Sequence, residues 1–122
     1  MSYKILVVDD ELSLVELVAQ FLESEGHNIK TANNGQEAFE IAKKWQPDLI
    51  VSDVQMPICN GFQLHEKLKT LPPPIIPILF ISGYIGGDEL NMQNKTNILG
   101  FLAKPFKITD LLKYIENVKT KS

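Results

Sequence analysis

Short apolar, β-branched runs alternate with segments of helical periodicity along the whole of this chain. Strands are predicted at residues 3–8, 27–32, 48–52, 78–81 and 99–103. Helices are predicted at 12–25, in a segment that ends before Pro47, and at 61–70, 86–96 and 107–119. Short connections between alternating strands and helices favour a parallel sheet with right-handed crossovers and helices on both faces. The chain is therefore predicted to be an α/β protein, and its 122 residues suit a single domain over residues 1–122.

The predicted helix 86–96 differs from the other helices. Its apolar face consists of little more than Leu90 and Met92, so we expect it to be weakly held and movable. The prolines at 72–74 and Pro77 form a stiff connector before strand 78–81, because proline fits neither a helix interior nor a central strand.

Chemically reactive side chains follow four of the five predicted strands. Asp9 and Asp10 come after the first strand, Asp53 after the third, Ser82 after the fourth and Lys104 after the fifth. Ligands of open α/β sheets bind outside the carboxyl ends of the strands. If these strands are parallel neighbours, three carboxylates, a hydroxyl and an ammonium group converge on one site.

This set of groups points to phosphoryl transfer. Three clustered carboxylates repel one another unless their pKa values rise or a cation neutralises them, and Mg²⁺ is the leading candidate because it binds carboxylates while keeping waters for a phosphate. Lys104 and Ser82 could contact phosphoryl oxygens, and aspartate can act as the nucleophile that forms an aspartyl phosphate. Taken singly, an acidic pair is usually a helix cap and a Ser-Gly pair a turn. The occurrence of all these groups together, at the ends of four separate strands, favours a phosphoryl-transfer site over these local structural roles.

The composition narrows the classes of partner. The net charge is −3 and all twelve basic residues are lysines, which argues against direct nucleic-acid binding. A single cysteine, Cys59, fits a reducing compartment, and the apolar runs are far shorter than a membrane helix requires. The amino-terminal residues carry no secretory signal. A cytoplasmic protein that binds no membrane is expected.

Taken together, the motifs resemble those of the receiver domain of bacterial response regulators over essentially the whole chain. The family pattern is an acidic pair after strand one, Asp-x-x-Met-Pro-x-x-x-Gly after strand three, Thr or Ser after strand four and Lys-Pro after strand five. The corresponding segments here are Asp9–Asp10, Asp53 to Gly61, Ser82 and Lys104–Pro105. The resemblance implies a flavodoxin-like, doubly wound (βα)5 fold with a five-stranded parallel sheet in the order 2-1-3-4-5.

The resemblance also implies a role for each matching residue. Asp53 would accept a phosphoryl group from the phosphohistidine of a sensor histidine kinase or a phosphotransfer protein. Asp10, Asp53 and the backbone carbonyl of Gln55 would bind Mg²⁺ directly, and Asp9 would bind it through water. Lys104 would contact the phosphoryl group and precede a cis peptide bond. The domain would be no enzyme in the ordinary sense, since it would catalyse only its own phosphorylation and dephosphorylation.

The implied output is a shift in surface. Ser82 would move toward the phosphoryl group, and Phe101, at the switch position, would turn inward. The surface of helix 86–96, strand 99–103 and helix 107–119 would then control a downstream effector or an attached output domain.

Three other functions compete with this one. A haloacid-dehalogenase-like phosphatase uses a second Asp two residues after the nucleophile, where this chain has Gln55. A Rossmann nucleotide-binding domain needs a glycine-rich loop after the first strand, which is absent. The third is a receiver-like domain that binds partners without being phosphorylated, and the intact set of acidic, hydroxyl and ammonium groups argues against it. The sequence fits both a stand-alone chain and a segment of a larger regulator.

Overall fold

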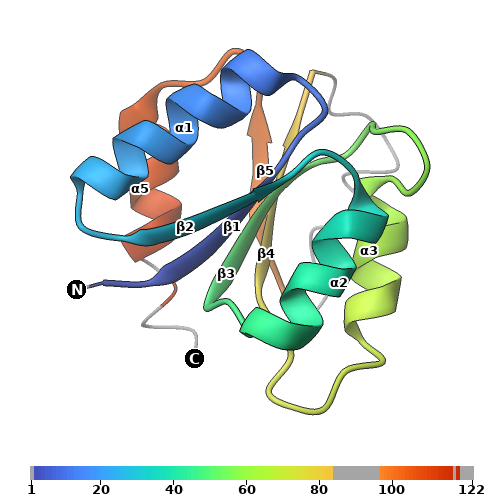
Figure 1. The fold of residues 1–122 in the computed structure, drawn as a ribbon. Coiled ribbons are helices and arrows are strands. Elements are labelled where there is room, and N and C mark those ends of the chain that lie inside the picture. Colours follow the sequence, from blue (N-terminus) through green and yellow to red (C-terminus); the bar gives the residue numbers. More distant parts are fainter. Residues whose placement is uncertain (1, 84–96, 117, 119–122) are drawn as a thin grey trace.

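A computed structural model describes residues 2–83, 97–116 and 118. Its central sheet lies between two layers of helices, with α1 and α5 on one face and α2 and α3 on the other (Figure 1). The strands are β1 (Lys4–Val8), β2 (Asn28–Ala32), β3 (Leu49–Asp53), β4 (Ile78–Ser82) and β5 (Ile98–Ala103). The helices are α1 (Leu12–Ser24), α2 (Gly35–Trp45), α3 (Gly61–Leu68) and α5 (Ile108–Glu116).

All paired strands run parallel, in the order β2-β1-β3-β4-β5. This arrangement confirms the predicted α/β class, the strand order and the flavodoxin-like architecture. Helix 86–96 lies outside the described residues. Among the residues that the structure does describe, no helix is both long and apolar enough to cross a membrane.

The helix boundaries have local causes. The side chain of Asn34 accepts a hydrogen bond from the Glu37 N–H and caps the start of α2. Asn60 and Gln63 form a reciprocal capping box at the start of α3. The predicted end of α3 at residue 70 was two residues too late, because the hydroxyl of Thr70 donates to the carbonyl of Lys67 and closes a turn there.

Two apolar layers bury the sheet on both sides. One layer packs between the sheet and helices α1 and α5, and the other between the sheet and helices α2 and α3. Every residue of β3 and of β4 is buried. Strands buried on both faces read as continuous apolar runs, as these do in the sequence. Their carboxyl ends are therefore fixed in position, which is what a precisely arranged site requires.

The loop between β3 and α3 is held against the start of α2. Gly35 donates its N–H to the carbonyl of Cys59 at 2.9 Å. A Cβ at position 35 would lie 2.7 Å from the Cys59 Sγ and 2.6 Å from its carbonyl oxygen, so only glycine permits this approach. Cys59 is 4% exposed as a result.

Candidate functional site

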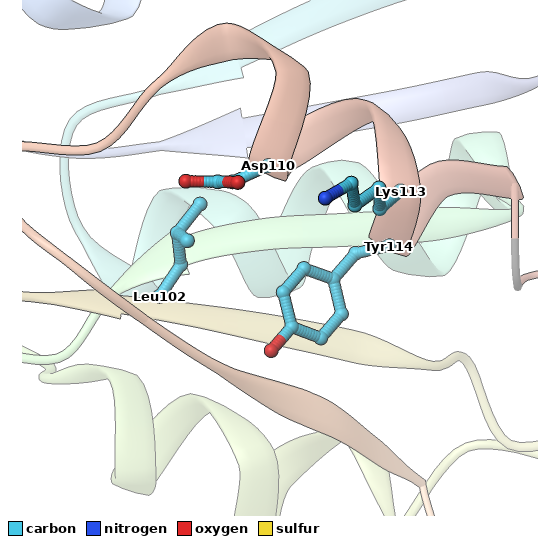
Figure 2. A pocket seen from close by; sticks show the side chains of 4 residues that line it. All are labelled: Leu102, Asp110, Lys113 and Tyr114. Atoms are coloured by element: carbon cyan, nitrogen blue, oxygen red, sulfur yellow. The ribbon is translucent and has the colours of Figure 1, made fainter.

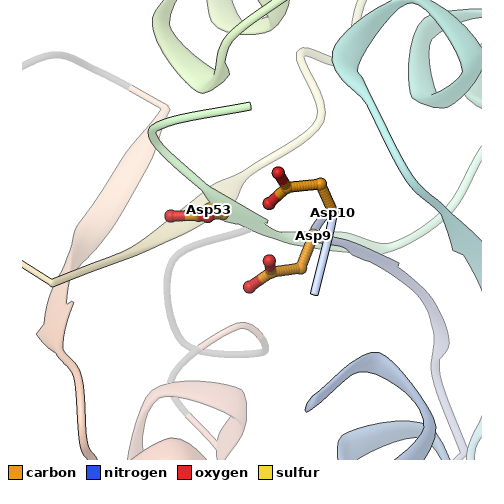
Figure 3. Close-up of side chains that lie close together, drawn as sticks. All are labelled: Asp9, Asp10 and Asp53. Carbon is orange, nitrogen blue, oxygen red and sulfur yellow. The ribbon is translucent and has the colours of Figure 1, made fainter. Parts of the chain in front are cut away.

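Three carboxylates meet at the carboxyl edge of the sheet. One oxygen each from Asp9, Asp10 and Asp53 lies within 4.8 Å of the others. Figure 3 shows the three side chains beside one another, two from the end of β1 and one from the end of β3. Asp9 and Asp53 are buried, whereas Asp10 is exposed. The predicted convergence of these three residues is therefore present.

Strand pairing explains the convergence. β1 and β3 are neighbours, with Val8 opposite Ser52, so the residues that follow them emerge side by side. The first carboxylate is also fixed by its own turn, because Asp9 Oδ1 accepts a hydrogen bond from the Glu11 N–H at 2.9 Å. Asp53 is the last residue of β3, one residue beyond the predicted end of that strand.

Lys104 connects the two buried carboxylates. Its Nζ lies 2.9 Å from Asp9 Oδ2 and 3.4 Å from Asp53 Oδ2. Its backbone N–H donates to the carbonyl of Ser82, which fixes the end of β5 against the end of β4. The peptide bond from Lys104 to Pro105 is cis, as predicted. One ammonium group thus offsets two acidic side chains from different strands.

The environment perturbs the acid–base properties of this pair. Burial raises the pKa of Asp53, the negative charge of Asp9 raises it further, and Lys104 only partly opposes them. Burial lowers the pKa of Lys104, but its hydrogen bond to Asp9 and the charges of both carboxylates outweigh this, so the net shift is upward. Lys104 therefore remains a cation, and ionised Asp53 is short of positive charge.

The chemistry of the donor set fits a hard divalent cation. Mg²⁺ binds oxygen ligands and usually retains several waters, and three carboxylates within 4.8 Å of one another match that preference. Asp10 is the exposed member of the set, so it could bind an ion that still faces solvent. Gln55 is exposed two residues after Asp53, and a hydrogen bond from its backbone to the Asp53 carboxylate keeps its backbone near the same edge.

The remaining predicted residues lie at two different depths. Ser82, 4% exposed, ends β4, and the residue before it, Ile81, pairs with Asp53 across the sheet. Phe101 lies below this edge, where its half-buried ring stacks on Phe80 with centroids 5.2 Å apart. The structure thus brings Ser82 to the edge that carries the carboxylates and places Phe101 in the adjoining core.

Two contributors were not assigned a role from sequence. Glu11 Oε1 lies 4.0 Å from Lys104 Nζ, and the only signal for it was that it directly continues the Asp9–Asp10 pair. In the sequence, Gly61 is distinguished only as the last residue of the Asp-x-x-Met-Pro-x-x-x-Gly motif. A Cβ at Gly61 would lie 2.5 Å from the carbonyl oxygen of Asp53, so its absence lets α3 approach the strand end.

Comparisons with known proteins agree on one protein family for this chain. The model of the response regulator receiver domain matches residues 5–116. The chain is 35% identical over 120 residues to the probable transcriptional regulator ycf29 of Porphyra purpurea. It is 40% identical over 116 residues to the autoinducer 1 sensor kinase/phosphatase LuxN of Vibrio campbellii. These matches cover 97% and 95% of this chain but only 57% and 13% of the respective relatives.

Solved structures agree with the sequence matches. The chemotaxis response regulator CheY4 of Vibrio cholerae superposes with a TM-score of 0.86 at 31% identity. That alignment covers 97% of this chain and 99% of CheY4. The receiver domain of the hybrid histidine kinase CckA gives a TM-score of 0.79 at 32% identity, over 94% and 97% of the two chains.

Proposed function

This chain belongs to the receiver domain family of response regulators, and we propose from that premise that it is a signalling switch activated by phosphorylation of Asp53. Receiver domains are regulatory domains that interact with histidine kinases and output domains, and they generally bind Mg²⁺ at an acidic pocket. The observation that carries the proposal is the position of Lys104 Nζ, within 3.4 Å of carboxylate oxygens of both Asp9 and Asp53. A cation beside a nucleophilic carboxylate suits the acceptance of an anionic group.

In the proposed reaction, an Asp53 carboxylate oxygen attacks the phosphorus of a phosphohistidine. The new O–P bond forms as the P–N bond breaks, and the imidazole leaves with the electron pair of that bond. Asp10, Asp53 and the Gln55 carbonyl would hold Mg²⁺ directly and Asp9 would hold it through water, and the bound ion would neutralise charge on the phosphoryl oxygens. Lys104 remains protonated throughout and exchanges its contact with Asp53 for a phosphoryl oxygen.

Loss of the phosphoryl group would occur at the same residues. A water molecule would attack the phosphorus of the aspartyl phosphate, releasing inorganic phosphate and restoring the Asp53 carboxylate. Gln55 is exposed beside this position, where its side chain could affect the approach of water. In this proposal both reactions take place at the chain's own Asp53.

We assign the conformational response to Ser82 and Phe101. Ser82 would move its hydroxyl toward a phosphoryl oxygen, since it already ends the strand next to Asp53. Phe101 is half-buried and would complete its burial by changing its stacking on Phe80. Two packed arrangements of one aromatic ring make a switch that a local change of charge can bias.

The proposed readout surface includes β5 and α5, together with residues 86–96, which lie outside the described structure. β5 is an edge strand, so it can face a partner. A hollow of about 400 Å³ lies between β5 and α5, lined by Leu102, Asp110, Lys113 and Tyr114 (Figure 2). The proposed partners are a sensor histidine kinase or a phosphotransfer protein upstream, and an effector protein or output domain downstream.

The test is phosphorylation by a small donor. The protein is incubated with acetyl phosphate and Mg²⁺, and its intact mass is recorded beside Asp53→Asn and a magnesium-free sample. We expect one added phosphoryl group that requires both Asp53 and Mg²⁺. Beryllofluoride, a phosphoryl mimic, is titrated in parallel to include a receiver that ignores small donors. Failure of both reagents would leave the binding-only function, and turnover of added phosphate esters would favour a phosphatase.

A further inference from the structure

His65 and Asn97 form a buried hydrogen bond that the proposed phosphotransfer does not use. Asn97 Nδ2 donates to the carbonyl of Ile76 at 3.4 Å, which directs its Oδ1 toward His65. His65 Nε2 donates to that oxygen at 2.8 Å. The two residues are 0% and 8% exposed. Because water does not readily replace either partner there, separating them costs free energy.

Asn97 joins three segments at the amino end of the sheet. Its side chain contacts α3 through His65 and the proline-rich connector through Ile76. Its backbone carbonyl accepts a hydrogen bond from the Ile78 N–H at 2.9 Å, where β4 begins beside β5. This one residue therefore sets the position of α3 relative to the start of the strand that carries Phe101.

A continuous row of rings leads from His65 to Phe101. The His65 ring lies edge-on to Phe80, with centroids 6.3 Å apart, and Phe80 is stacked on Phe101 at 5.2 Å. Phe62 lies edge-on to Phe80 at 5.3 Å and to Phe101 at 6.4 Å. Phe80 is 0% exposed. In such a close-packed interior, Phe101 cannot reorient freely unless Phe80 or Phe62 adjusts.

We propose that His65 is a positioning residue, whose bond to Asn97 holds Phe80, and through it Phe101, in the stacked arrangement. This inference rests on the proposed function, because it assigns Phe101 to the switch. The hydrogen bond is short and buried while Phe101 is stacked. The inward turn of Phe101 requires Phe80, the ring on which it is stacked, to move, and this movement strains the bond between His65 and Asn97. Removal of the bond therefore favours the activated arrangement.

The test compares the affinity of the full chain for beryllofluoride in the presence of Mg²⁺, followed by amide NMR. His65→Leu removes the donor and keeps an apolar side chain in the core. We expect it to bind beryllofluoride roughly 2- to 30-fold more tightly, the range found for coupling between a site and a distant network. His65→Gln restores a donor close to the position of Nε2, so we expect it to return the affinity to the wild-type value.

Two further variants separate positioning from general destabilisation. Leu68→Ala leaves a cavity on the same helix at a residue that is 1% exposed, without touching the hydrogen bond. Its affinity for beryllofluoride is expected to stay within about twofold of wild type, although its urea midpoint falls. In a Phe101→Ala background, His65→Leu is expected to have no further effect, because the ring that it positions is gone.

The outcomes distinguish this inference from the function on which it rests. Unchanged or weaker binding by folded His65→Leu overturns the positioning role and leaves the phosphorylation switch standing. Wild-type protein that neither binds beryllofluoride nor gains a phosphoryl group overturns both. If His65→Leu does not fold, Asn97→Ala removes the other partner, and the same tightening is expected of it.

Discussion

The α-carbon of Gly61 faces the backbone carbonyl of Asp53, and a Cβ added there would lie 2.5 Å from the carbonyl oxygen. The same Cβ would lie 3.0 Å from Cε1 of Phe80, which is buried in the core. Neither neighbour is the free end of a flexible side chain. The first residue of α3 thus limits how β3 can end.

Gly61→Ala is therefore expected to destabilise the fold by about 1–3 kcal/mol, the usual cost of overpacking. Alanine ordinarily stabilises a helix relative to glycine, so the sign of the change is the informative result. Urea unfolding measures it. Gly83→Ala is the matched control, because a Cβ at Gly83 meets no atom of the described residues within 4 Å, and its unfolding midpoint is expected to remain near that of wild type. Equal midpoints for both variants would contradict the argument.

Asp53→Asn is expected to stabilise the metal-free protein at neutral pH. The folded-state pKa of Asp53 is raised, first by burial and then by Asp9, so the folded state holds this proton more tightly than the unfolded state. Stability is therefore lost as the pH rises from the unfolded-state pKa through the raised folded-state pKa. The difference in unfolding free energy between variant and wild type should grow across that window and then level off. If this difference in unfolding free energy did not change with pH, the titration of Asp53 would be excluded as its cause.

Lys104→Met is expected to tighten Mg²⁺ binding while slowing phosphorylation. The ammonium group stands 2.9 Å from Asp9 and 3.4 Å from Asp53, so it competes with a cation for both carboxylates. Removing one charge at this distance should raise the affinity for Mg²⁺ roughly tenfold, the equivalent of about 1.4 kcal/mol. Calorimetric titration tests this against exposed Lys107→Met. Weaker Mg²⁺ binding by Lys104→Met would show that the lysine does not compete.

A separate pH effect is expected from His27, far from the carboxylates in sequence. Its Nδ1 accepts the Tyr3 N–H at 3.1 Å and its ring stacks on Tyr3, so only the neutral ring keeps this bond. Burial lowers the pKa of His27. Its contribution to stability is complete above the unfolded-state value near 6.5 and declines as the pH falls toward the folded-state value. His27→Phe, which keeps a ring but cannot accept, should lose this part of the pH dependence of unfolding.

The parallel α/β architecture and the position of the site followed from the sequence for a physical reason, whereas the strand order came from the family resemblance. Apolar runs buried on both faces are recognisable, and Asp9 and Asp53 directly follow two of them. To predict that these carboxylates lie close together, it was enough to know that neighbouring parallel strands end at the same edge of the sheet. The resemblance to the receiver family supplied the individual roles of Lys104, Ser82 and Phe101, and these roles stay predictions.

Other features depend on distances that a sequence does not record. His65 showed no spacing with a possible ligand or partner, because the residue that accepts its hydrogen bond, Asn97, is 32 positions away and directly precedes β5. Gly61 ended a motif, but the 2.5 Å approach behind it depends on how α3 packs. Lys104 was assigned to a phosphoryl group, and its contact with Asp9 emerged only from the folded chain.

The close contact between Gly35 and Cys59 makes the Cys59 thiol an intrinsic chemical reporter of loop opening. Cys59 is the sole cysteine of the chain, and burial raises the pKa of its thiol, with only partial opposition from Lys67. A thiol reagent must therefore wait for the β3–α3 loop to separate from α2. The modification rate of unaltered protein then measures how often the loop beside Asp53 opens, and the same rate after phosphorylation would show whether that loop tightens.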